Sequence, residues 1–162
     1  NPYALSLRDK DGTIARSGKV NKNILARLLM DDYFSRDIPK SLDRNYFNSS
    51  LIESLSVPDG AATLTSFSAA AVGLGLRFFP ETPCRWLVTG GGRHNSAMML
   101  ALRSLLATLV EPVENVGWNG DSLEAQAFAY LAVRSILNLP ISFPKTTGVQ
   151  VPVTGGTRHN PE

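Results

Sequence analysis

The sequence lacks several features that mark particular classes of protein. Its only cysteine is Cys84, which excludes a disulfide within the chain and makes a reducing cytoplasm the expected compartment. No second histidine or cysteine stands at metal-ligand spacing from His94, so no metal site is predicted. No order of serine, histidine and aspartate suggests a nucleophilic triad. These absences argue against a disulfide-stabilised fold, a zinc site and a serine hydrolase.

Strong charge and a long hydrophobic run are also missing. The formal net charge is +2, which is too small to indicate binding to nucleic acid or to an anionic membrane. Residues 61–76 carry no charge, but they are rich in small residues and shorter than the ~20 apolar residues of a membrane span. A buried core helix is predicted there. The first residues show no basic segment followed by an apolar run, so no signal peptide is expected.

Local patterns predict an α/β fold in a chain of ordinary domain size, 162 residues. An extended or hairpin unit is expected within residues 1–20, and Pro58–Gly60 is expected to mark a break. Asp59 is the expected N-cap of the core helix, whose Gly73 and Gly75 suggest that another backbone approaches closely. The predicted helices cover residues 23–34, 51–55, 61–79, 121–138 and a segment from Asn95 or Ser96 onward; the predicted strands cover 84–89 and 109–113, and 139–162 is predicted to be a surface tail.

The stretch over residues 87–95 is the first of two around which the chain is organised. An apolar strand is predicted to run into a turn of Gly90, Gly91 and Gly92, with a helix starting at Asn95 or just after it. Glycine lets a backbone approach a ligand, and a helix N-terminus offers unpaired N–H groups to an anion. No Walker lysine follows, and the spacing differs from the dinucleotide fingerprint. A plain tight turn is the alternative, but the position between strand and helix favours a phosphate site.

The second stretch covers residues 117–125 and starts another predicted helix. Asp121 and Glu124 have the spacing of a capping box, with Asp121 as N-cap and Glu124 at the third helical position, and this needs no ligand. Alternatively, Glu124 accepts hydrogen bonds from the hydroxyl groups of a substrate. The two interpretations are compatible in part, because a carboxylate accepts several donors.

A polar loop over residues 39–48 contains Lys40 and Arg44. It is predicted either to be a solvated connection or to present its cations and amides to a cleft, as functional loops often do. Asn48 or Ser49 is expected to cap the short helix that follows it.

Taken together, these motifs resemble the C-terminal half of anhydro-N-acetylmuramic acid kinase, a bacterial sugar kinase family of the actin-like ATPase superfamily. The match rests on the order and spacing of many short segments rather than on one motif. They are Asp11-Gly12, 17–20, 32–34, 39–41, Arg44, 46–48, 88–92, Asn95, 120–125, 127–129, 139–140 and 147–148. The resemblance implies an α/β lobe of the ribonuclease-H-like class, with helices on a small mixed sheet.

The family phosphorylates the 6-hydroxyl of 1,6-anhydro-N-acetylmuramic acid while water opens the anhydro ring, using ATP and Mg²⁺. The product, N-acetylmuramic acid 6-phosphate, enters cell-wall recycling. By resemblance, Gly90, Gly91, Gly92 and Asn95 would line the nucleotide side of a cleft, and Glu124 would hold the sugar. The expected partners are therefore the sugar and ATP, and a homodimer is possible.

Two family segments are not found in the sequence. They are a first phosphate loop, Gly-Thr-Ser-x-Asp-Gly, and the segment Asp-Thr-Gly-Pro-Gly-Asn, whose aspartate is the general base. The chain is therefore expected to be a single lobe, 1–162, of a two-lobe enzyme, with no catalytic base of its own and no kinase activity alone. Two alternatives stay open, namely a non-catalytic binding module with the same fold and a kinase acting on a different sugar.

Overall fold

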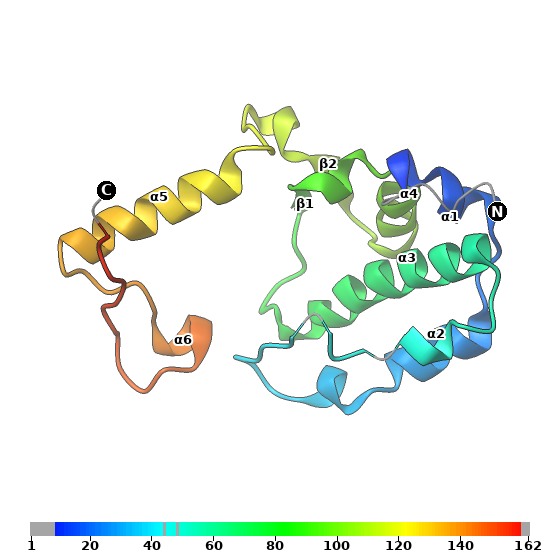
Figure 1. The fold of residues 1–162 in the computed structure, drawn as a ribbon, viewed down its shortest axis with the longest axis horizontal. Helices are drawn as coiled ribbons and strands as arrows, with labels where there is room; N and C mark the ends of the chain where they lie inside the picture. The colour runs from blue at the N-terminus through cyan, green and yellow to red at the C-terminus, as the bar shows by residue number, and fades with distance from the viewer. Residues whose placement is uncertain (1–8, 44, 48, 160–162) are drawn as a thin grey trace.

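The computed structural model describes residues 9–43, 45–47 and 49–159. A long central helix, α3, lies among α1, α2 and α4, and α5 extends away from these helices together with the segment that follows it (Figure 1). The helices and strands are α1 (Thr13–Ser17), α2 (Lys22–Leu29), α3 (Val57–Leu74), β1 (Arg85–Val88), α4 (Ser96–Leu105), β2 (Leu109–Pro112), α5 (Leu123–Ile136) and α6 (Pro144–Thr147). Short 3₁₀ turns cover Lys10–Gly12, Asp32–Ser35, Ser49–Leu51, Gly75–Phe78, Gly91–His94 and Val113–Val116.

The described residues contain one sheet, made of two parallel strands. β1 pairs with β2 in a register that sets Trp86 opposite Val110, and α4 connects the two strands as a crossover helix. Both strands were predicted from their short apolar runs, and the mixed α/β class is confirmed. The residues of β1 after Arg85 are only half-buried, so the expected cover on both faces is incomplete.

The core lies where α3 and α4 meet β2. Its buried members are all apolar: Ala69, Met99, Leu102, Leu106 and Val110. Met99 and Leu102 are three positions apart on α4 and therefore face the same side. Burial of this side holds α4 between the sheet and α3, and so fixes the turn that precedes α4.

The start of α3 differs from its prediction. The helix begins at Val57, and the N-cap is Ser56, whose hydroxyl accepts the N–H of Asp59 at 3.2 Å. Pro58 lies in the first turn, where a missing N–H costs nothing, so this segment is not a break. Asp59 as N-cap is therefore wrong, because its carboxylate instead accepts the N–H of Lys19 at 2.7 Å.

The glycines in the second half of α3 do not mark a close contact. A Cβ placed on Gly73 or Gly75 would meet no atom within 4 Å, so the predicted approach of another backbone is wrong. The helix continues as a 3₁₀ turn to Phe78. By length and hydropathy alone, Val57–Phe78 could cross a membrane, and it is the one stretch among the described residues that could; a helix in a protein core passes the same criterion.

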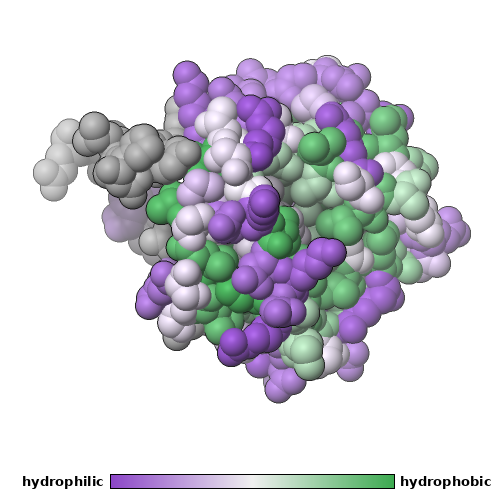
Figure 2. Space-filling model, turned by 90° about the vertical axis from the view of Figure 1, so that its right-hand side faces the viewer, coloured by the Kyte–Doolittle hydropathy of each residue, from purple (hydrophilic) through white to green (hydrophobic). Residues whose placement is uncertain are grey.

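Part of the apolar surface of α3 stays open. Leu64, Val72 and Leu74 are exposed, although α3 packs against α1, α2 and α4. The face at the end where α1 and α2 lie also shows hydrophobic side chains between hydrophilic ones (Figure 2). The predicted burial of this helix on several sides is thus incomplete.

The segment before α2 is helical over Lys10–Ser17, so the predicted extended or hairpin unit is wrong over these residues. The two carboxylate oxygens of Asp9 accept the N–H groups of Ile14 and Ala15 at 2.8 and 3.0 Å. These bonds satisfy amides that have no partner within the helix, and so they start α1. The predicted N-cap of α2 is confirmed as Asn21, whose side chain accepts the N–H of Ile24.

After α5 the chain folds back along that helix. The hydroxyl of Ser135 bonds to the carbonyl of Gly155, and Ser142 pairs with Val153 in an isolated antiparallel bridge. α6 lies between these two bridge residues. On α5, four large apolar residues are exposed, Phe128, Tyr130, Val133 and Ile136, and so is Leu137, which follows the helix. The surface-tail assignment of 139–162 stays a prediction.

Candidate functional site

The glycine turn follows β1 as predicted, but it does not lead directly into a helix. Gly90 has φ 69°, and a 3₁₀ turn, Gly91–His94, comes before α4. Asn95 is the N-cap of α4, and its side-chain oxygen accepts the N–H of Met98 at 3.0 Å. A Cβ on Gly90 or either following glycine would meet no atom within 4 Å. The three glycines are exposed, although the N–H and the carbonyl of Gly90 already have partners within the chain.

A polar cleft of about 260 Å³ opens beside this turn. Gly91, His94 and Asn95 line one part of it, and the segment Asp9–Asp11 lines the other. Gly12 allows the two parts to lie in close contact. A Cβ at this residue would overlap the side-chain oxygen of Asn95 and lie 2.8 Å from the backbone nitrogen of Ala97. Sequence reasoning placed Gly91 and Asn95 here but missed residues 9–11, whose only signal was a short Asp-Gly motif.

The two stretches singled out in the sequence meet at Gly120. Its carbonyl accepts the N–H of Gly90 at 3.4 Å and the hydroxyl of Thr89 at 3.2 Å. Its own N–H donates to the carboxylate of Glu114 at 3.2 Å. The glycine turn and the segment leading to α5 are thus hydrogen-bonded neighbours, although about 30 residues separate them along the chain.

Arg93 is the side chain that sequence reasoning missed at this junction. Only 3% of the side chain is exposed, and its Nε donates to Glu114 at 2.8 Å. Nη1 donates to the carbonyl of Gly90 at 2.9 Å, and Nη2 pairs with Asp121 at 2.8 Å. The adjacent Arg93 guanidinium is the main cause that lowers the pKa of Asp121 below its ordinary 3.8. The Asp121 carboxylate is therefore charged at neutral pH and available to the arginine.

The capping box predicted at Asp121 and Glu124 is wrong. α5 begins at Leu123 after Ser122, and the side-chain oxygen of Asn119 accepts the N–H groups of Asp121 and Ser122 instead. The carboxylate of Asp121 is turned away from the helix toward Arg93. A local pattern suggested a local bond, but a distant arginine offers a charged partner for the same carboxylate.

Glu124 lies in the first turn of α5, four residues beyond Gly120. Its side chain is exposed and has no hydrogen bond or ion pair with the described residues. Gly90, Gly92 and Glu124 do not line the cleft that contains Gly91 and Asn95. The structure therefore brings the two stretches together at Gly120, and leaves the Glu124 carboxylate free to accept a ligand.

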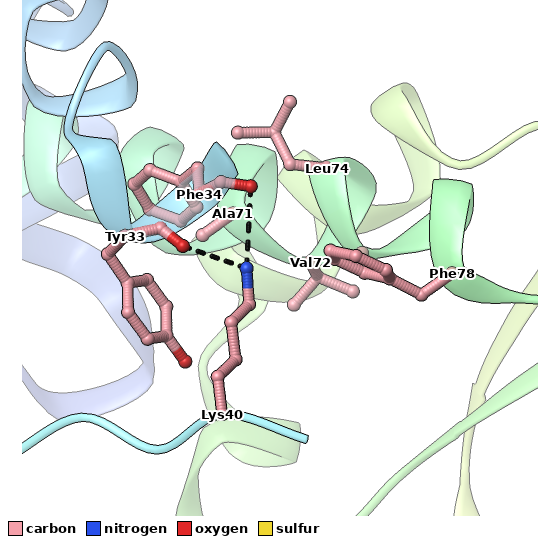
Figure 3. Close-up of a pocket in the computed structure, with 8 residues that line it drawn as sticks. Tyr33, Phe34, Lys40, Ala71, Val72, Leu74 and Phe78 are labelled. Carbon is pink, nitrogen blue, oxygen red and sulfur yellow. Dashed lines mark hydrogen bonds between the residues drawn. The ribbon is translucent and has the colours of Figure 1, made fainter. Parts of the chain in front are cut away.

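Lys40 is half-buried and lies outside this cleft, among the residues that line a separate pocket of about 340 Å³. Its ammonium donates to the carbonyls of Tyr33 at 2.8 Å and Phe34 at 3.4 Å (Figure 3). It also donates to the carbonyl of Arg36 at 3.0 Å. It also lies 4.6 Å from the ring centre of Phe78, within reach of a cation–π contact. Burial is the main cause of the lowered pKa of Lys40. Lys40 thus holds together the end of the Asp32–Ser35 turn.

Among the described residues of the loop over 39–48, Lys40 is the one cation. Arg44 and Asn48, named in the sequence analysis, lie outside the described residues. The predicted short helix over 51–55 is a 3₁₀ turn, Ser49–Leu51, that starts two residues earlier. Within the described part of this loop, Lys40 is a cation that lines a pocket, but its ammonium already donates to three backbone carbonyls.

Replacing Asn95 separates its role as a cap from a role in binding. Asn95→Ala is expected to lower the free energy of unfolding by about 1 kcal/mol, because α4 loses its N-cap acceptor. Asn95→Ser keeps an acceptor, and its stability is expected to stay within a few tenths of a kcal/mol of the original. Urea denaturation followed by circular dichroism measures both. Equal losses of unfolding free energy in Asn95→Ala and Asn95→Ser would contradict the capping role.

The chain was also compared with known proteins. The family model described as anhydro-N-acetylmuramic acid kinase matches residues 5–160. The chain belongs to the anhydro-N-acetylmuramic acid kinase family. A relative with that name from Paramagnetospirillum magneticum is 52% identical over 156 residues, which are 94% of this chain and 44% of the relative. Relatives with the same name from Rhodospirillum rubrum and Roseobacter denitrificans are 53% and 54% identical, over 92% and 91% of this chain.

The chain spans less than half the length of these family members. The matched segment is 40% of the Rhodospirillum rubrum protein and 40% of the Roseobacter denitrificans protein. The turn, the cleft and the junction at Gly120 all fall inside the region that the family model matches.

Proposed function

We propose that this chain supplies part of the nucleotide and sugar sites of an ATP-dependent kinase. The kinase converts 1,6-anhydro-N-acetylmuramic acid, ATP and water into N-acetylmuramic acid 6-phosphate and ADP. Water adds at the anomeric carbon as the 1,6-anhydro bond breaks, and the freed 6-oxygen takes the γ-phosphoryl group. The observation that carries the proposal is membership of the anhydro-N-acetylmuramic acid kinase family across residues 5–160.

The exposed glycine turn supports a nucleotide role. No atom lies within 4 Å of where a Cβ would stand on Gly90, Gly91 or Gly92, and Asn95 lines the cleft next to Gly91. A phosphate group is bound well by unhindered backbone amides near the N-terminus of a helix. We assign these four residues to the nucleotide side, as the lobe of a ribonuclease-H-like, actin-like ATPase would place them.

The free carboxylate of Glu124 supports a sugar role. It is exposed, unpaired among the described residues, and joined to the glycine turn through the hydrogen bonds of Gly120. An ionised carboxylate accepts hydrogen bonds from several hydroxyl groups at once, which suits a sugar. The cytoplasmic location and the possible homodimer stay predictions.

Mg²⁺ is expected to accompany ATP, but we assign it no ligand in this chain. No group of three histidine, cysteine or acidic side chains suited to a metal occurs among the described residues. Both carboxylate oxygens of Asp9, one of the two acidic residues that line the cleft, already accept backbone amides. These residues do not form a magnesium site by themselves, and no step is derived through the ion.

A chimera tests the proposed function. The matching 149 residues of the Rhodospirillum rubrum relative would be replaced by those of this chain, which are 53% identical. The chimera is expected to phosphorylate 1,6-anhydro-N-acetylmuramic acid with kcat/KM within about tenfold of the relative, or ~1.4 kcal/mol in activation free energy. A folded chimera without activity would contradict the proposal.

The isolated 162-residue chain is the control for this assay. It is expected to show no turnover, because phosphoryl transfer needs charge neutralisation and positioning from both sides of the phosphate. Measurable product from the chain alone would contradict the assignment of a single lobe.

A further inference from the structure

We propose that Arg93 is a positioning residue that holds the segment before α5 against the glycine turn. It thereby keeps the nucleotide and sugar sites at a fixed position relative to each other. The inference rests on the proposed function and adds to it a residue with no assigned role. Each guanidinium nitrogen has its own partner, on three different segments: Gly90 in the turn, Glu114 in the Val113–Val116 turn and Asp121 before α5. One side chain therefore ties three segments together.

Burial makes this arrangement specific to arginine. The side chain is 3% exposed, so its charge depends on its partners rather than on water. A guanidinium supplies donors in a rigid planar fork, whereas a lysine has one compact ammonium that cannot reach three separated acceptors in the same plane. Arg93→Lys keeps the positive charge and loses the planar set of donors. This variant therefore separates the contribution of charge from that of donor geometry.

The backbone at Gly120 is fitted to the same guanidinium. A Cβ on Gly120 would lie 2.5 Å from Nε of Arg93, 2.7 Å from its central carbon and 2.9 Å from an oxygen of Glu114. The guanidinium thus occupies the position of the missing side chain. The guanidinium therefore lies next to Gly120, whose carbonyl accepts hydrogen bonds from Thr89 and Gly90.

The junction is also the route by which α5 is connected to the rest of the chain. In Figure 1, α5 leaves from the loop after β2 and projects away from the central helices. Glu124 stands at the start of this helix, in its first turn. Its position relative to the glycine turn therefore depends on the bonds at Gly120 and Asp121, which Arg93 supports.

Hydrogen exchange on the 162-residue chain tests the contact itself. In Arg93→Ala, the amides of Gly90 and Gly120 are expected to exchange at least about tenfold faster, while the amides of α3 keep their rates. Arg85→Ala is the matched control, because it removes an exposed arginine that pairs with Glu111 at 3.5 Å at the other end of β1. Unchanged exchange at Gly120 in Arg93→Ala would overturn the proposal.

A second variant tests the fit at Gly120. Gly120→Ala is expected to speed exchange at Gly90 to a similar extent, because the new methyl group displaces the guanidinium. In Arg93→Ala the guanidinium is gone, and the remaining neighbour is the side-chain carboxylate of Glu114, which can rotate; adding Gly120→Ala is therefore expected to change the exchange rate less than about twofold further. Fully additive effects in the double variant would overturn the fit of Arg93 against Gly120.

Kinetics of the chimera test positioning as opposed to simple stability. Arg93→Ala and Arg93→Lys are expected to lower kcat at least about tenfold with both KM values within about threefold, since misaligned sites still bind their ligands. A raised KM for ATP alone, with unchanged kcat, would show a ligand contact and overturn the positioning role. An inactive original chimera would contradict the proposed function instead, and exchange at Gly120 would then decide on Arg93.

Discussion

Gly18→Ala is expected to lower the free energy of unfolding by about 3 kcal/mol or more, at the upper end of overpacking effects. The new Cβ would overlap the carbonyl carbon and oxygen of Pro58 and lie 2.7 Å from the nitrogen of Asp59. These are backbone atoms in the first turn of α3, so no side chain can rotate to make room. The bond from Lys19 to Asp59 at 2.7 Å holds the two segments in this contact.

Gly73→Ala is the matched control, because it adds the same methyl group to the same helix where nothing lies within 4 Å. It is expected to stabilise the protein by up to about 1 kcal/mol, since alanine has less backbone freedom to lose in a helix. Urea denaturation of the 162-residue chain measures both changes. Similar losses of stability in the two variants would contradict the close contact between Gly18 and Pro58.

Strands and helices with a clear apolar pattern were predictable from the sequence. Trp86, Leu87 and Val88 form a short apolar run bounded by prolines and glycines, and this run is β1. Asn95 precedes a run of apolar residues with helical spacing, and it caps α4 as expected. Such features depend on neighbours within a few residues, so local reasoning reaches them.

The two aspartates predicted as caps show what local reasoning cannot reach. Asp59 and Asp121 both have cap-like positions, yet one accepts the N–H of Lys19 and the other pairs with Arg93. Both partners lie far away along the chain, 40 residues in the first case. A capping motif shows only that a carboxylate can bond locally, and the tertiary fold decides which donor it meets.

The same limit applies to the candidate site. The glycine turn was found from its residues, because an apolar strand followed by three glycines is unusual. The cleft wall at residues 9–11 and the guanidinium of Arg93 were not found, because they depend on which distant segments lie side by side. An arginine directly after glycines carries no local sign that it will be buried between two carboxylates.

Glu124→Ala in the chimera is expected to raise the KM for 1,6-anhydro-N-acetylmuramic acid about 30-fold, or ~2 kcal/mol. That is the scale of a hydrogen bond to a charged group. The KM for ATP is expected to stay within about twofold, because the side chain is exposed and does not line the cleft beside Gly91. Steady-state kinetics with each substrate varied in turn measures the two values.

Two further variants define what the carboxylate of Glu124 does. Glu124→Gln keeps one acceptor oxygen and loses the charge, so its KM for the sugar is expected to fall between those of the original and the alanine variant. Glu81→Ala removes an exposed glutamate in the segment before β1 and is expected to change neither KM. An unchanged KM for the sugar in Glu124→Ala would contradict the assignment of Glu124 to the sugar site. The family membership and the junction at Gly120 would stand, because neither depends on this side chain.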